Sequence, residues 1–361
     1  MGNILFIFKR LKSMDKKAML DTIDKVKKET GKSKISIFLD MQKCARRYGA
    51  GYSDYYLLEF YNKTEEQRNT YLTRGRNNSL CLKYCDMDYA HYFVNKTEFN
   101  EKFNEYLKRD WINVNESEKE KIINFFKKHE TFMAKPIDGF SGQGIEKIKT
   151  SSYKSYDELY EYLTKDGANY ELEEVIKQHP EVNKIYPDSI NTIRVVTIVT
   201  TEDDKPLISL LKEERKNAKL KCRVIFACCR IGNGKCVDNF GNGGMVAPVD
   251  VDTGIISAVA IDKQKNVYEK HPKTGYDIKG FKFPYWDKVL EMCKKASFEI
   301  PEMGYTGWDV AITPEGPVFV EGNELPGYNL YQMPVHTPDK IGVMAKFDFM
   351  NKDKYIVKDN K

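Results

Sequence analysis

The chain has 361 residues, of which 41% are hydrophobic and 31% are charged. This composition is typical of a folded globular protein, and the length favours two or three packed lobes over one small domain. The 58 Lys and Arg residues against 53 Asp and Glu residues leave a net charge of only +5. That surplus is too thin and too dispersed to predict a nucleic-acid substrate.

The sequence predicts neither a membrane span nor a disulfide framework. No segment approaches the ~18 apolar residues that cross a bilayer. The eight cysteines form no C-x-x-C pair, so we expect reduced thiols in a cytoplasmic protein. Residues 2–12 are apolar and then basic, which is the wrong order for a cleaved signal peptide. We expect a helix that packs on its own domain there, and the alternative is peripheral contact with a membrane surface.

The first quarter of the chain is predicted to be mainly helical. Residues up to Thr30, and the ranges 36–51 and 54–71, carry apolar side chains on one face of a helix. We therefore assign residues 1–94 to a mainly helical N-terminal region. Helical spacing of apolar side chains continues over residues 95–111.

Short strands replace this pattern after residue 130. A strand over 131–135 leads into a Gly-rich loop, and residues 146–148 form a second strand, so the loop is predicted to connect a hairpin. The other predicted strands lie at 170–176, 192–200, 223–230, 255–260, 308–312 and 318–321. Helices are expected at 157–163 and 286–297. Alternating strands and helices indicate an α+β or α/β nucleotide-binding core.

The Gly-rich loop follows a lysine at the end of its strand. Lys135 precedes a group of small residues, which are Gly139, Ser141, Gly142 and Gly144. Backbone N–H groups in such a loop can bind phosphate oxygens, and the lysine adds a positive charge. The loop is not a P-loop, because no Gly-Lys-Ser/Thr opens a helix after it. The pattern predicts phosphate binding, and the alternative is an ordinary turn.

A late hairpin carries two carboxylates. Apolar strands flank a turn at 313–316, so we expect Asp309 and Glu321 side by side on adjacent strands, with Asn323 on the same face. Two carboxylates and an amide oxygen form an all-oxygen site that suits Mg²⁺ on nucleotide phosphates. A solvated hairpin face is the alternative, although unpaired carboxylates within apolar strands would be costly.

An acidic strand over 170–176 lies between these two segments in the chain. It is predicted to pass from one lobe to another and is followed by Glu181. Exposed backbone there is suited to pair with an adenine, and a following carboxylate is suited to hold ribose hydroxyls. Alone, the segment would be an ordinary acidic strand.

Together these segments resemble the ATP-grasp superfamily. Lys135 before a Gly-rich loop, the Glu-Glu-Val-Ile run at 173–176, and Asp309 ahead of Glu321-Gly322-Asn323 occur in the order of that family. The nearer resemblance is to the sugar-transfer-associated ATP-grasp proteins. It rests on the runs 187–194, 238–244, 307–309 and 321–323, and covers the chain from about residue 48 to residue 332.

The resemblance implies an α+β ATP-grasp fold in which two lobes clamp ATP. Residues 95–172 would form the small lobe with the phosphate loop, 173–345 the large lobe with the metal site, and 346–361 a C-terminal tail. Lys96 and Lys135 would contact the phosphates. Glu173, Glu174 and Ile176 would face adenine, the last two partly through their backbone. Glu181 is the candidate for ribose.

The resemblance also implies that Asp309, Glu321 and Asn323 carry Mg²⁺, with Mn²⁺ as an alternative. Many amide-forming members place an arginine two residues before the metal aspartate, where this chain has Gly307. Arg194 and Arg230 are the candidates to stabilise the transferring phosphoryl group instead.

The implied activity is that of an ATP-dependent carboxylate–amine ligase, which forms an amide through an acyl phosphate. The family name suggests surface-polysaccharide modification or assembly, with a hexuronic acid and an amino acid as candidate substrates. One alternative is a kinase that phosphorylates a sugar or glycan hydroxyl. The other is a non-catalytic nucleotide-binding scaffold.

Three features have two interpretations each. His271 is either an acid–base or substrate-contacting group or a residue that shapes a turn. The run 238–244 either lines the acceptor pocket or forms a tight loop. Trp308 is expected in the core rather than as a stacking surface.

Overall fold

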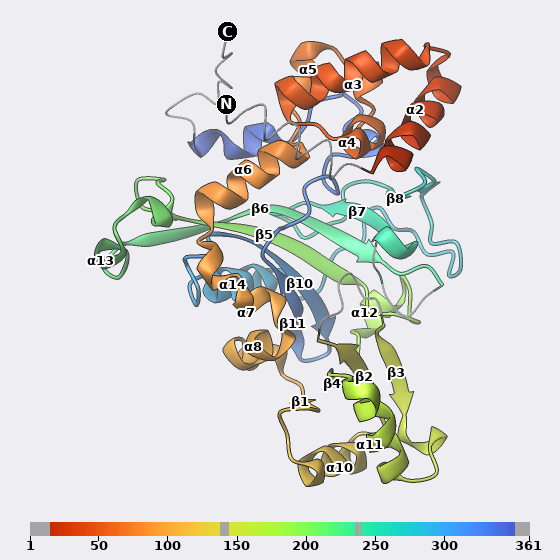
Figure 1. The fold of residues 1–361 in the computed structure, drawn as a ribbon, viewed down its shortest axis with the longest axis vertical. Coiled ribbons are helices and arrows are strands. Elements are labelled where there is room, and N and C mark those ends of the chain that lie inside the picture. Colours follow the sequence, from red (N-terminus) through yellow and green to blue (C-terminus); the bar gives the residue numbers. More distant parts are fainter. Residues whose placement is uncertain (1–14, 138–143, 235–237, 239, 351–361) are drawn as a thin grey trace. The chain divides into compact units, whose positions relative to one another are not determined.

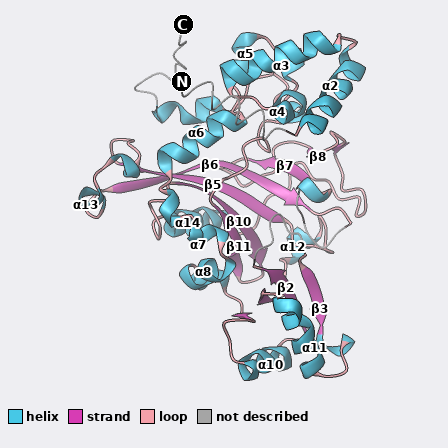
Figure 2. Cartoon of the chain, viewed as in Figure 1, coloured by secondary structure: helices cyan, strands magenta, loops and turns pink. Residues whose placement is uncertain are grey.

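The computed structural model describes residues 15–137, 144–234, 238 and 240–350. The predicted N-terminal helix over residues 2–12 lies outside these ranges. Contacts divide the chain into two compact units, one of Met1–Asn78 with Gln332–Lys361 and one of Ser79–Tyr331. Figure 1 labels the elements of both units, and Figure 2 distinguishes their helices from their strands. None of the helices in the described ranges is long and apolar enough to cross a membrane.

The first unit is helical, as predicted. Its helices are α2 (Lys16–Thr30), α3 (Lys34–Tyr48), α4 (Tyr52–Leu57), η1 (Phe60–Asn62), α5 (Glu65–Asn69), η7 (Pro334–His336) and η8 (Met344–Met350). Asp15 and Ser33 cap the N-termini of α2 and α3 by accepting first-turn N–H groups. Gly31 and Gly49 end the same helices in the left-handed region, which glycine adopts without steric cost.

The prediction of one helix over 54–71 is wrong, because three short helices occupy that range. Glu59 adopts a φ of 50°, which interrupts the helical backbone, and Thr64 caps a new helix by accepting the Gln67 N–H at 3.3 Å. The bend brings Arg68 to Asp40, to which it donates two hydrogen bonds of 2.8 and 2.7 Å. This bidentate pair joins the bent segment to α3.

Within the second unit, a four-stranded antiparallel sheet has the order β1-β4-β2-β3. Its strands are β1 (Trp111–Asn113), β2 (Thr131–Pro136), β3 (Glu146–Lys149) and β4 (Tyr170–Glu174). Helices α10 (Lys119–Lys128) and α11 (Tyr156–Thr164) pack on it around a core that includes Phe126 and Phe132. We call this sheet and its two helices the small sheet layer. The predicted hairpin between 131–135 and 146–148 is confirmed.

A seven-stranded antiparallel sheet forms the larger part of the second unit, in the order β11-β10-β5-β6-β7-β8-β9. Its strands are β5 (Thr192–Thr201), β6 (Leu220–Ile231), β7 (Met245–Val249), β8 (Ala260–Asp262), β9 (Val267–Tyr268), β10 (Tyr305–Thr313) and β11 (Gly316–Asn323). Helix α14 (Trp286–Ser297) packs against β5, β6, β10 and β11. Because both sheets are antiparallel, the core is α+β rather than α/β.

The prediction of a strand at 255–260 is wrong, since β8 begins only at Ala260. Ile255 bridges Lys282, whereas Ile256 bridges Val249. The two residues thus pair with different neighbours, and no continuous ladder forms over the predicted range.

The remaining helices are short. They are α6 (Arg74–Tyr84), η2 (Met87–Tyr89), α7 (His91–Val94), α8 (Lys96–Lys102), α9 (Asn104–Leu107), η3 (Thr150–Ser152), η4 (Lys165–Gly167), α12 (Pro180–Asn183), η5 (Leu207–Ser209), α13 (Lys212–Arg215) and η6 (Phe240–Asn242).

An aromatic cluster holds α8 and its C-terminal neighbour against the β10–β11 hairpin. Trp308 is fully buried, as predicted, and it stacks on Phe319 with ring centroids 4.8 Å apart. Phe103 packs edge-on against Trp308 at 5.3 Å, and the indole N–H donates to Thr197 Oγ1 at 2.9 Å. Since Lys96 is the first residue of α8, this cluster also positions Lys96 relative to the hairpin.

Candidate functional site

The β10–β11 hairpin brings the predicted metal ligands to one face. Thr313 Oγ1 donates to the Gly316 carbonyl at 2.9 Å and closes the turn. Asp309 pairs with Glu321 in the strand register, so the two side chains leave the same face of the sheet. Asn323 lies two residues further along that face, and its Nδ2 is buried with no hydrogen-bond partner among the described residues. The metal-binding role of the three side chains stays a prediction.

Asp309 is held between two arginines, which are the predicted phosphoryl-stabilising residues. Arg194 lies opposite Asp309 on β5; its Nε donates to Oδ1, and its second guanidinium nitrogen donates to Oδ2 at 2.9 Å. Arg230 on β6 also donates to Oδ2. Burial alone would raise the pKa of the Asp309 carboxyl, but the two guanidinium charges outweigh it and hold the pKa well below its usual range.

Gly307 leaves the space through which Arg194 reaches Asp309. A Cβ atom at position 307 would lie 3.2 Å from Arg194 Cδ and 3.1 Å from Pro326 Cβ. Both separations are tighter than ordinary van der Waals contact, so one neighbour would have to move. Gly307, which stands where many amide-forming ATP-grasp proteins have an arginine, is therefore adjacent to Arg194 on the next strand.

Asp238 extends this ion-pair chain away from the hairpin. Its Oδ1 accepts a hydrogen bond from Arg230 at 3.0 Å, and its Oδ2 accepts the Thr192 N–H at 2.9 Å as well as the Thr192 hydroxyl. Asp238 therefore orients Arg230, a contact that sequence reasoning did not identify. Residue 239 lies outside the described part of the chain, and the acceptor-pocket role of 238–244 stays a prediction.

Glu321 is placed differently from its partner carboxylate. Its side chain is exposed, and no ion pair to it is found within the described ranges. Surrounding protein atoms and the neighbouring Asp309 carboxylate raise the pKa of Glu321. Two adjacent carboxylates, of which only Asp309 accepts hydrogen bonds from the two arginines, fit a hard cation such as Mg²⁺.

Lys135 lies at the end of β2 and points to a buried carboxylate. Its Nζ donates to Glu173 Oε2 at 2.7 Å, and Arg109 Nε donates to the same oxygen at 2.8 Å. Burial would raise the pKa of Glu173, but Arg109 and Lys135 lower it to about 2. The Glu173 side chain is thus engaged with these two cations, and its predicted adenine contact stays a prediction.

Arg109 is a site residue that sequence reasoning missed. Besides Glu173, it donates to the carbonyl oxygen of Phe319 on β11. It thereby connects β4 of the small sheet layer to the hairpin that carries Asp309 and Glu321. The only sequence signal is indirect: a buried glutamate on β4 needs a cationic partner, but no motif surrounds Arg109.

Lys96 reaches the same end of β2 from helix α8. Its Nζ donates to the carbonyl oxygens of Pro136 and Ile137 at 2.8 and 3.1 Å. Burial lowers the pKa of Lys96, and the positive charge of the nearby Lys135 lowers it further. The negative charge of Glu321 acts in the opposite direction, but the net shift is downward. The two predicted phosphate lysines therefore converge around the start of the Gly-rich loop, where a polyanion would relieve their repulsion.

Most of the Gly-rich loop lies outside the described residues. Gly139, Ser141 and Gly142 belong to that part, and their phosphate contacts stay predictions. Gly144 is described, and it has a φ of 72° where the chain turns toward β3. A Cβ atom there would lie 2.9 Å from Pro136 Cγ, so glycine is needed at this position for local packing.

The predicted adenine and ribose residues follow β4. Glu174 exchanges hydrogen bonds with Asp110, donating its backbone N–H at 2.9 Å and accepting the Asp110 N–H through its side chain at 3.2 Å. Ile176 is half-buried just beyond the strand. Glu181 is exposed in α12 and pairs with Lys184 at 2.7 Å. Their nucleotide contacts stay predictions.

His271 shapes a turn, which was one of its two interpretations. Its Nε2 lies 2.9 Å from the Gly232 carbonyl oxygen, and its Nδ1 lies 3.2 Å from the Lys273 N–H nitrogen. The ring stacks on Tyr186 with centroids 4.6 Å apart, and burial lowers its pKa. Because backbone groups occupy both ring nitrogens, this arrangement supports a neutral structural histidine rather than an acid–base group.

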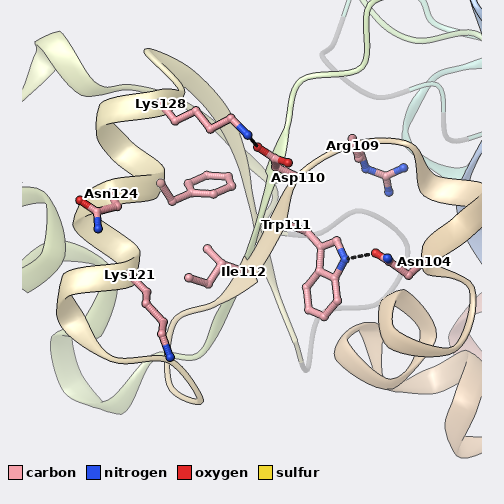
Figure 3. Close-up of a pocket in the computed structure, with 9 residues that line it drawn as sticks. Asn104, Arg109, Asp110, Trp111, Ile112, Lys121, Asn124 and Lys128 are labelled. Carbon is pink, nitrogen blue, oxygen red and sulfur yellow. Dashed lines mark hydrogen bonds and ion pairs between the residues drawn. The ribbon is translucent and has the colours of Figure 1, made fainter.

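A pocket of about 460 Å³, which Arg109 and Asp110 help to line, opens at the edge of the small sheet layer (Figure 3). Trp111, whose indole N–H donates to Asn104 at 2.9 Å, lies on one side of it, and α10 supplies Lys121 and Lys128. None of the predicted site residues lines this pocket. Asp110 beside it accepts from Lys128 and lies 2.8 Å from His129 Nε2, so its charge is already paired.

Comparison with known proteins gives one family and several distant structures. A family model described as sugar-transfer associated ATP-grasp matches residues 76–338. No match was found among curated proteins. The chain is similar to the ATP-grasp ligase PsnB complexed with minimal precursor, Mg and ADP, at 13% identity and a TM-score of 0.38 over 71% of this chain and 59% of that chain. It thus spans less than two thirds of PsnB.

The chain is also similar to D-alanine–D-alanine ligase from Bacillus anthracis complexed with ATP. The identity is 11% and the TM-score 0.42, over 75% of this chain and 68% of that chain.

A buried glutamate next to the lysines gives a pH-dependent prediction. Glu171 accepts from Thr97 Oγ1 at 3.0 Å and from the Asn100 amide, and burial and Glu173 raise its pKa to about 7. The folded state therefore holds this proton more tightly than the unfolded state. We expect the free energy of unfolding to fall as pH rises from about 5 to 7, by at most about 1.4 kcal/mol per pH unit.

Urea unfolding at several pH values measures this slope. Glu171→Gln has no proton to release, so its decline over the same range should be shallower than that of the wild type. Glu161→Gln, an exposed substitution on α11, serves as the matched control and should keep the wild-type slope. Equal slopes for Glu171→Gln and the wild type would contradict the assignment.

Proposed function

Because the chain belongs to the sugar-transfer-associated ATP-grasp family, we propose that it is an ATP-dependent carboxylate–amine ligase. A substrate carboxylate oxygen attacks the γ-phosphorus of ATP, which gives an acyl phosphate and ADP. An amine then attacks the acyl carbon, phosphate leaves, and an amide forms. The observation that carries this proposal is geometric: Lys96 and Lys135 meet at the end of β2. Arg109, which shares Glu173 with Lys135, also donates to the backbone of β11 in the candidate metal hairpin.

In this reaction the two lysines bind the phosphate oxygens of ATP. Lys96 and Lys135 are both half-buried, so each charge acts in a partly dehydrated environment where it is worth more than in water. Lys135 is oriented by Glu173, which is itself fixed by Arg109. This preorganisation spares the site from rearranging as charge develops on the transferring group.

The metal site is proposed on the hairpin face. Glu321 and Asn323, with Asp309, would hold Mg²⁺, or Mn²⁺ in its place, which neutralises charge on the β- and γ-phosphates. Asp309 already binds two guanidinium groups, so it serves the cation and the arginines together. The register that pairs Asp309 with Glu321, and so puts both carboxylates on one face of the hairpin, supports this assignment.

Arg194 and Arg230 are proposed to stabilise the transferring phosphoryl group. A guanidinium stays charged at any working pH and offers several donors in a fixed plane. Asp309 and Asp238 hold the two groups in place, and each arginine keeps donors beyond those contacts. They would supply the positive charge that other amide-forming members place two residues before the metal aspartate.

The family description supports a sugar-linked substrate. We propose a carboxylate on a small molecule or glycan, such as a hexuronic acid, and an amine such as an amino acid, in surface-polysaccharide modification or assembly. The test supplies ATP, Mg²⁺, and uronic acids paired with amino acids, and measures phosphate release and amide product. A ligase needs both substrates for sustained turnover. Phosphate transferred to a product without amine would indicate a kinase, and ATP binding without consumption would indicate a scaffold.

Glu321→Gln should separate chemistry from folding. The substitution keeps the shape of the side chain but removes its charge, so turnover should fall by about 100-fold or more because a transition-state interaction is lost. Unfolding by urea should change little, since Glu321 is exposed. Glu315→Gln, in the turn of the same hairpin and also exposed, is the control and should retain activity. Wild-type turnover in Glu321→Gln would rule out its metal role.

Gly307→Ala tests whether Arg194 needs the space beside β10. The new methyl group would press on Arg194 Cδ and Pro326, and a guanidinium displaced by a fraction of an ångström should lower kcat by about tenfold. The KM for ATP should change little. Gly51→Ala is the control, because a Cβ there meets nothing within 4 Å. An unchanged kcat in Gly307→Ala would show that the close approach is not functional.

A further inference from the structure

Helix α3 in the first unit is apolar on two faces. Ile37, Met41 and Cys44 face inward and are buried in the core of that unit. Ile35 and Leu39, in contrast, are 74% and 59% exposed, and Phe38 is 38% exposed. The spacing i, i+3, i+4 places these three side chains together on one outer face. We call Ile35, Phe38 and Leu39 the α3 outer stripe.

Scattered single apolar residues on a surface are ordinary, but the α3 outer stripe is contiguous. Three large side chains within two helical turns form one apolar patch. Helix propensity does not require them, because Lys, Glu or Gln would serve an exposed helix face equally well. Nor does the core require them, since the inward face of α3 already supplies its packing. The stripe therefore calls for an external contact.

The surface around the stripe is strongly basic. Residues 16–48, which span α2 and α3, contain ten Lys and Arg residues against four Asp and Glu residues. This surplus of six exceeds the net charge of +5 of the whole chain, so the rest of the chain is close to neutral. All ten cationic side chains are exposed. The net positive charge of the chain is thus concentrated on residues 16–48, which include the stripe.

Cations lie on both sides of the stripe and at its end. On the helical projection Lys34 and Lys43 lie to either side of Ile35 and Leu39, and Arg46 lies about two turns beyond Phe38 on the same face. Lys34 pairs with Asp24, and Lys43 pairs with Glu65. These pairs are exposed, and exposed pairs contribute little and exchange readily with other anions.

We propose that the α3 outer stripe docks on an anionic membrane surface. Ile35, Phe38 and Leu39 would enter the boundary between headgroups and acyl chains, while Lys34, Lys43 and Arg46 would contact anionic headgroups. Apolar side chains on one face, flanked by Lys and Arg, are the pattern by which helices bind in the plane of a membrane. Anionic lipid also complements a surface with a net positive charge. The proposal does not depend on the ligase activity.

Flotation of the full chain with lipid vesicles tests the docking. The wild type should bind vesicles that contain about one third phosphatidylglycerol in phosphatidylcholine, and should not bind phosphatidylcholine alone. Binding should weaken in about 0.5 M NaCl, because salt screens the headgroup contacts. The triple variant Ile35→Ser, Phe38→Ser, Leu39→Ser should bind the anionic vesicles at least about tenfold more weakly.

The control variant replaces three exposed apolar residues elsewhere, Leu211→Ser, Val267→Ser and Ile341→Ser, which are 68%, 51% and 45% exposed. It should bind vesicles as the wild type does. Thermal unfolding should be similar in all three proteins, since each substitution is on the surface. A Lys34→Gln, Lys43→Gln, Arg46→Gln variant should lose the preference for anionic lipid.

Three results would overturn the proposal. The first is a wild-type chain that does not bind anionic vesicles. The second is equal vesicle binding by the wild type and the stripe variant, which would assign the contact to another segment. The third is a wild-type dimer in light scattering that the stripe variant converts to monomer, because the stripe would then be an interface between two copies of this chain.

Discussion

The contact of the buried Asp309 carboxylate with two guanidinium groups is the interaction on which the candidate site of the large sheet depends. Three adjacent strands, β5, β6 and β10, each contribute one charge to it. Buried charges of this kind are tolerated only when paired, and loss of one partner costs about 3–5 kcal/mol. The register that places Arg194 opposite Asp309 is thereby fixed, and the pairing of β10 with β11 then places Glu321 beside Asp309.

On the small sheet layer, a second buried carboxylate is likewise held by two cations. Glu173 accepts hydrogen bonds from Lys135 and Arg109, and Arg109 also donates to the backbone of β11. One buried carboxylate therefore orients Lys135, the predicted phosphate contact. The other cation bound by that carboxylate, Arg109, joins the sheet of Lys135 to the candidate metal hairpin. In both clusters the charged side chains hold one another in place, which is the condition under which electrostatic stabilisation is effective.

The parts of the site that depend on local sequence could be predicted, and those that depend on long-range pairing could not. The turn at 313–316 and the strand alternation were enough to place Asp309 opposite Glu321. Nothing local indicated that Arg109 would bind Glu173, because the two residues are 64 positions apart. The break of the expected helix at 54–71 was also missed, because amphipathic spacing continues through Glu59, whose φ of 50° is one that residues other than glycine seldom adopt.

A structure of the chain with magnesium and a non-hydrolysable ATP analogue tests the proposed site most directly. We expect one Mg²⁺ bound by Glu321, Asn323 and Asp309, with the nucleotide phosphates contacting Lys96 and Lys135, while Arg194 keeps its contact with Asp309. A metal bound elsewhere would contradict this expectation, as would hairpin side chains turned to opposite faces of the sheet or phosphates that lie away from both lysines.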